Sequence, residues 1–167
     1  GGTANHTSSE FNMTLEIQYS DKFSVLVNGI TVVCTDAVEG EKGIISYKGE
    51  DRVFTKRSKN QITTDNAAST CTSGITDMSY LFDGKSNFDQ DISSWDVSQV
   101  VNMEKMFNNA HTFNQDISKW DVSSVTNMYA MFFNAQIFNQ DLSSWNVGAV
   151  TNMGAMFNSA TLFNQDI

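Results

Sequence analysis

The chain has 167 residues, of which 40% are hydrophobic and 17% charged, and its formal net charge is −9. This length and apolar content suffice to bury a core, and the absence of a long apolar run leaves no segment that spans a bilayer. The acidic balance disfavours nucleic acid and anionic membranes, so we expect neither as a partner.

The N-terminal part predicts a small β-rich cap over residues 11–74, preceded by a flexible segment at residues 1–10. The sequence FNMTLEIQYS at residues 11–20 alternates apolar and polar side chains, as a half-buried strand does. Apolar runs on both sides of Asn28-Gly29 predict a hairpin with a two-residue turn, and a second hairpin is expected to turn near Lys48-Gly49-Glu50. A short helix is expected to begin near Thr64-Asp65.

The chain contains two cysteines, Cys34 and Cys71. An even count in a polar chain favours a disulfide formed in an oxidising compartment. The bond would stabilise the fold by roughly 3–4 kcal/mol through loop closure. Two unpaired buried thiols are the alternative.

From residue 75 onward the sequence repeats with a period of 25 residues: a partial unit, three units from residue 88, and a fragment at 163–167. Large apolar residues recur in columns, and we expect them to form the core because one unit cannot bury its apolar face alone. These core columns are Trp95, Trp120, Trp145, Met103, Met128, Met153, Phe88, Phe113, Phe138 and Phe163.

Within each unit the apolar spacing changes from two to three or four residues. Trp120 and Val122 predict one short strand, and the following Val125, Met128 and Met131 predict a helical or 3-10 segment. The expected fold class is therefore an α/β solenoid of leucine-rich-repeat-like coils behind the β-rich cap. A parallel β-helix is the alternative, and the Met-x-x-Met spacing argues against it.

Polar residues of the expected strands point away from the core and are the candidate binding face. These residues are Ser94, Asp96, Ser98, Lys119, Asp121, Ser123, Ser144 and Asn146. A second acidic column consists of Asp91, Asp116 and Asp141, which we expect to hydrogen-bond nearby backbone in turns. Calcium is the weaker alternative for this column, because clustered carboxylates are its preferred ligands. The sequence carries no recognisable catalytic motif, and we expect no enzyme activity and no cofactor.

Units of the form FNQDISxWDVSxVTNMxxMFxxA resemble the BspA-type leucine-rich repeats of bacterial surface proteins, and the same units characterise a family of unknown function first noted in mycoplasmas. The segment with VNGITVVC and TCTSGITDM also resembles the cap of marine and flavobacterial members. The resemblance implies a secreted or cell-surface protein that acts in adhesion, with a disulfide that holds the cap together.

We therefore expect an extracellular binding module that recognises a protein or glycan on a host, a matrix or a neighbouring cell. The alternative is a structural spacer, or a unit that associates end to end with other copies or continues into further repeats after Ile167. Measurement of self-association and of ligand binding separates these two hypotheses.

Overall fold

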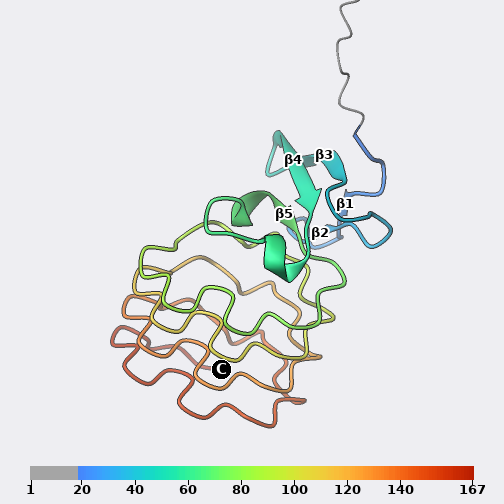
Figure 1. The fold of residues 1–167 in the computed structure, drawn as a ribbon. Helices are drawn as coiled ribbons and strands as arrows, with labels where there is room; N and C mark the ends of the chain where they lie inside the picture. The colour runs from blue at the N-terminus through green and yellow to red at the C-terminus, as the bar shows by residue number, and fades with distance from the viewer. Residues whose placement is uncertain (1–18) are drawn as a thin grey trace, which may run out of the picture.

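The structure is a computed structural model that describes residues 19–167. The flexible segment predicted at residues 1–10 and nearly all of the strand predicted at 11–20 lie outside the described residues. Five short strands gather at one end of the molecule, and the chain then winds away from them in successive stacked turns towards the C-terminus (Figure 1).

A two-stranded antiparallel sheet joins β1 (Ser24–Val25) to β2 (Val32–Val33). The hairpin predicted around Asn28-Gly29 is confirmed, but its turn is longer than two residues. The Oδ1 atom of Asn28 accepts hydrogen bonds from the N–H groups of Ile30 and Thr31, at 3.0 and 2.9 Å. This side chain closes a wider loop, in which Gly29 supplies a positive φ of 72°.

The second sheet has the order β3-β4-β5, with β3 at Lys42–Tyr47, β4 at Glu50–Lys56 and β5 at Thr70–Cys71. β3 and β4 are antiparallel, and β4 and β5 are parallel. The hairpin predicted near Lys48-Gly49 is confirmed: both residues have positive φ, at 52° and 85°, as a two-residue type I′ turn requires. The predicted disulfide is also confirmed, because Cys34 and Cys71 are bonded.

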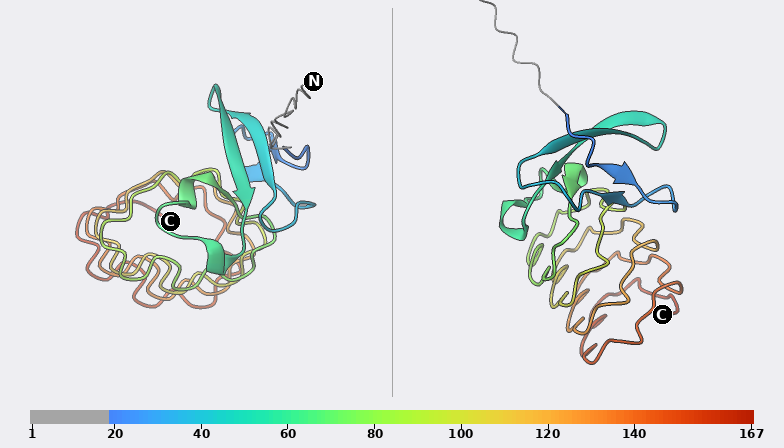
Figure 2. Two further views of the ribbon diagram at one scale, coloured as in Figure 1. Left: turned by 45° about the horizontal axis from the view of Figure 1, so that its top comes forward. Right: turned by 90° about the vertical axis from the view of Figure 1, so that its right-hand side faces the viewer.

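The connection from β4 to β5 crosses the end of the stacked turns (Figure 2). It contains the 3-10 turns η1 (Lys59–Gln61) and η2 (Ala67–Ser69), so the predicted helix exists only as three residues that begin at Ala67. Ile62 and Ala67 join the apolar cluster of the repeats, and the indole N–H of Trp95 donates to the Ala67 carbonyl at 3.0 Å. Among the residues described, no helix is long and apolar enough to cross a membrane.

Residues 75–167, called here the repeat region, are held together by bonds between equivalent positions of neighbouring units. The N–H groups of Met103, Lys105 and Phe107 each donate to a carbonyl of the next unit at 2.9 Å. The rings of Trp95 and Trp120 stack with centroids 6.2 Å apart, and the Phe column stacks at 5.7 to 6.0 Å. The three Trp side chains are at most 5% exposed, whereas Met153 and Phe163, in the last two units, are half-buried.

The predicted α/β solenoid of leucine-rich-repeat-like coils is wrong. Within residues 19–167 the only helical residues are those of η1 and η2, and both sheets lie in the N-terminal part. The repeat units contain neither the predicted strand nor the predicted helical segment. Their β contacts are single parallel bridges that join Asp77, Asn102, Asn127 and Asn152 in succession. A parallel β-helix requires strands in each unit, so this alternative does not describe the repeats either.

The units consist instead of consecutive tight turns. Met106 donates to the carbonyl of Met103 at 3.2 Å, and Ala110 donates to that of Phe107 at 3.1 Å. The third residue of each of these turns, Lys105 or Asn109, has a positive φ, as a type II turn requires. A turn closed from residue i to i+3 places its two end residues on the same side. The resulting apolar spacing is the same as on one face of a helix, and this explains the error.

Candidate functional site

The N-terminal sheets contact the repeat region at the first part of the predicted binding face. Ser73 donates to the carboxylate of Asp96 at 2.6 Å, and the N–H of Val32 donates to the Ser94 carbonyl at 2.8 Å. Ser94 and Asp96 are 3% and 8% exposed. These two predicted binding residues therefore anchor the cap and are not available to a partner.

Asp91, the first residue of the acidic column, also joins the two parts of the molecule. Its carboxylate accepts from the Lys48 ammonium at 2.9 Å and from the Ser93 hydroxyl at 2.6 Å. Burial opposes ionisation of Asp91, but the hydrogen bonds from Ser93 and Lys48 outweigh it and hold its pKa below the ordinary value. The Tyr47 and Ser93 hydroxyls lie 3.1 Å apart and complete this contact.

The other predicted binding residues lie on successive units outside the cap contact. Ser98 is half-buried, and five residues are exposed: Lys119, Asp121, Ser123, Ser144 and Asn146. The Oδ1 atom of Asp121 accepts from the N–H and the hydroxyl of Ser123, at 3.1 and 2.6 Å, so one carboxylate oxygen is committed to the turn. The second oxygen and the Lys119 ammonium have no hydrogen-bond or salt-bridge partner among residues 19–167, which leaves one anionic and one cationic group for a ligand.

The acidic column of Asp91, Asp116 and Asp141 caps turns. Each Oδ1 accepts from the N–H of the serine two residues later, at 2.9 to 3.0 Å. Hydrogen bonds from Ser143 lower the pKa of Asp141. In the described part of the chain, no group of three or more His, Cys, Asp or Glu side chains gathers as a metal site would require.

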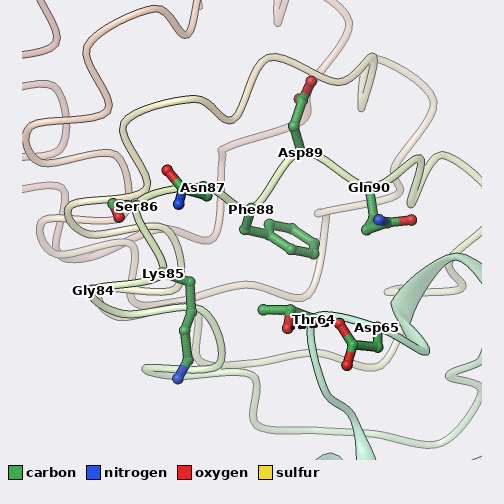
Figure 3. A pocket seen from close by; sticks show the side chains of 9 residues that line it. All are labelled: Thr64, Asp65, Gly84, Lys85, Ser86, Asn87, Phe88, Asp89 and Gln90. Carbon is green, nitrogen blue, oxygen red and sulfur yellow. Dashed lines mark hydrogen bonds between the residues drawn. The ribbon is translucent and has the colours of Figure 1, made fainter.

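A pocket of about 420 Å³ lies where the β4–β5 connection meets the start of the repeats (Figure 3). Its volume falls in the range of small-ligand sites, roughly 300–1,000 Å³. Sequence reasoning missed this pocket because it joins two segments about 20 residues apart. The feature of the sequence that could have indicated a gap at this place is that no equivalent motif precedes the first FDQD motif. The lining residues are Thr64, Asp65, Gly84, Lys85, Ser86, Asn87, Phe88, Asp89 and Gln90.

Two exposed tyrosines flank a lysine on another side of the repeats. The Lys105 ammonium lies 5.4 Å from the ring centroid of Tyr80 and 6.0 Å from that of Tyr129. The Tyr80 hydroxyl donates to Glu104 at 2.5 Å, and this hydrogen bond, with burial and the charge of Glu104, raises the pKa of Tyr80. The tyrosines occupy different positions of their units, so the repeat alignment did not place them together.

The 25-residue units, joined through single bridges and stacked rings, define a repeat protein with a disulfide-bonded N-terminal cap. The chain belongs to the family described as "Mycoplasma protein of unknown function, DUF285", whose model matches residues 51–167. The predicted relationship to a family first noted in mycoplasmas is thereby confirmed. No curated protein and no solved structure was found to be similar to the chain.

Proposed function

We propose that this protein is an extracellular binding module that recognises a protein or glycan through the exposed face of its repeat region. The observation that carries the proposal is the set of exposed polar side chains on successive units, with Lys119 and Asp121 at its centre. A buried aromatic column holds these units in register, so the exposed groups are positioned before a partner binds. Preorganisation of this kind lowers the entropic cost of binding.

Two further features support an extracellular site of action. The Cys34–Cys71 disulfide is typical of an oxidising compartment. The resemblance of the units to BspA-type repeats of bacterial surface proteins points the same way, and we propose adhesion on that basis. Many copies on one surface would raise a weak affinity through multivalency.

The proposal is tested by probing the protein against arrays of glycans and of extracellular-matrix proteins. Lys119→Glu reverses the charge on the exposed face, and we expect it to weaken binding to any array partner. Lys42→Glu makes the same charge change at an exposed position of β3 and should leave binding unchanged. No binding on either array, or equal effects of the two variants, would count against this function.

A further inference from the structure

We propose that the pocket between Thr64-Asp65 and residues 84–90 binds a neutral saccharide that carries an acetamido group. The acetamido carbonyl oxygen would accept hydrogen bonds from the main-chain N–H of Asp89 and the side-chain amide of Gln90. This inference rests on the proposed binding function and names a ligand class and a site for it. The site is separate from the exposed face around Lys119 and Asp121.

In the later units, a pair of donors from one unit binds an oxygen of the preceding unit. The N–H of Asn139 and the Nε2 of Gln140 both donate to the amide oxygen of Asn114, at 3.0 and 2.9 Å. One unit later, the N–H of Asn164 and the Nε2 of Gln165 donate to the amide oxygen of Asn139 in the same way, at 2.9 and 3.0 Å. Each pair binds a single amide oxygen supplied by the preceding unit.

Asp89 and Gln90 occupy these two positions in the first full unit, where no equivalent asparagine precedes them. Neither the Asp89 N–H nor the Gln90 amide has a hydrogen-bond partner among residues 19–167. The carboxylate of Asp89 serves the next unit, since it accepts from the N–H of Asn114 at 3.0 Å. The N–H of Asn114 and both donors of the Asn139–Gln140 and Asn164–Gln165 pairs bind the preceding unit. We infer that the equivalent donors of Asp89 and Gln90 face the pocket, whose wall both residues form (Figure 3).

The remaining lining residues favour a neutral, hydroxyl-rich ligand. Asp65 and Asp89 carry two negative charges and Lys85 one positive charge, which disfavours an anion. The Asp65 carboxylate can accept hydrogen bonds from sugar hydroxyls, and the exposed Asn87 amide both donates and accepts. The ring of Phe88, which points towards Thr64 in Figure 3, is 3% exposed and stacks on Phe82, so it forms the floor of the pocket. An amide oxygen combined with several hydroxyls describes an N-acetylated hexosamine.

Calorimetric titration with N-acetylglucosamine and its short oligomers tests this proposal, with glucose and glucosamine as ligands that lack the acetamido group. We expect saturable binding of the acetylated sugars only. Gln90→Leu should weaken that binding about fivefold, which corresponds to the loss of one neutral hydrogen bond. The matched control is Gln115→Leu, the same change one unit later at a residue outside the pocket, and it should bind as the wild type does. Both variants should keep the wild-type melting midpoint.

Amide NMR locates the ligand. Addition of N-acetylglucosamine should shift the Asp89 resonance more than that of Asn114, its equivalent one unit later. The proposal is overturned if glucose binds as well as the acetylated sugar, if Gln90→Leu equals the control, or if N-acetylasparagine amide, a peptide-like source of the same oxygen, binds more tightly than the sugar. Array binding that depends on Lys119 but ignores Gln90 would overturn the pocket proposal and leave the proposed function standing.

Discussion

Short aspartate and asparagine side chains fix the turns of the repeat region residue by residue. In three columns, the Oδ1 atom accepts a hydrogen bond from the N–H two residues later at distances of 2.9 to 3.2 Å. Asn146 makes this bond at the position where the preceding unit has Asp121. The turn therefore needs the oxygen but not the charge, and replacement of Asp by Asn separates the two contributions.

The Asp91→Asn variant keeps the oxygen acceptor and removes the charge at the contact between the cap and the repeat region. The pKa of Asp91 is lower in the folded protein than its ordinary value near 3.9, so ionised Asp91 stabilises the fold above that pH and this contribution disappears as the pH falls through the folded pKa. Because the Lys48 ion pair is partly exposed, we expect the variant to lose less than about 1 kcal/mol at pH 6. Its stability should then fall less than that of the wild type between pH 5 and pH 2.

Urea unfolding at pH 6, 4 and 3 measures this difference. Asp116→Asn is the control, since Asp116 caps the equivalent turn one unit later and forms no salt bridge among the described residues. If Asp91→Asn and the control show the same pH dependence, the Lys48–Asp91 pair contributes nothing to acid sensitivity.

The second residue-scale prediction concerns backbone strain. Ala155 has a φ of 56° and lies at the position where Lys105 and Ala130 also have positive φ. A non-glycine residue in this region is strained by roughly 1–2 kcal/mol, and glycine adopts it freely. Ala155→Gly should therefore raise the free energy of unfolding by about 1 kcal/mol. Ala149→Gly, at an exposed position without positive φ, should lower it by about 0.5–1 kcal/mol. Equilibrium denaturation of both proteins gives the signs, and a loss at both sites would refute the role of φ.

At the scale of elements, local signals predicted the hairpins and the disulfide but not the form of the repeats. Gly49 favours this turn locally, because glycine adopts positive φ without strain, and Lys48 beside it also has a positive φ. The Met103-to-Met106 spacing satisfies a helix and a tight turn equally well, so periodicity could not separate them. Asn109 at the third position of its turn was the available clue, because asparagine tolerates positive φ. Burial of Ser94 and Asp96 depends on where the cap docks, which no local pattern within the repeats reveals.

The tryptophan column is the element that we expect to contribute most to the stability of the repeats. Trp120 is 3% exposed, stacks on Trp95 and donates from its indole N–H to the Ile92 carbonyl at 3.2 Å. Trp120→Ala should cost roughly 3–5 kcal/mol, as is usual for a buried aromatic residue. Trp120→Phe keeps a stacked ring, and the Ile92 carbonyl still accepts a hydrogen bond from the main-chain N–H of Trp95. We therefore expect a smaller loss of stability for this variant. Thermal and urea unfolding measure both variants, and equal losses would show that stacking contributes little.

For the molecule as a whole, two apolar clusters are joined by polar contacts and by Ile62 and Ala67 of the β4–β5 connection, which pack into the cluster of the repeats. The cap has its own core around Phe54 and the disulfide, and the repeat region has a separate core along its Trp, Met and Phe columns. Hydrogen bonds from Thr72 and Ser73 to Asp96, together with the bond from Trp95 to the β4–β5 connection, join them. The cap therefore determines which surfaces of the first unit stay open, including the proposed saccharide pocket.

The disulfide should accordingly control the cap more than the repeats. A bond between residues 37 apart contributes roughly 3–4 kcal/mol by loop closure. The N–H of Cys34 donates to Ser73, which in turn donates to Asp96. Loss of the disulfide should therefore loosen the attachment of the cap to the repeats as well as the core of the cap. In the Cys34→Ala/Cys71→Ala double variant we expect β4 amides to exchange with deuterium much faster, while Met128, bonded to the next unit, keeps more of its protection. The wild type reduced under native conditions should behave like the variant. Equal acceleration in β4 and at Met128 would instead show that cap and repeats unfold as one cooperative unit.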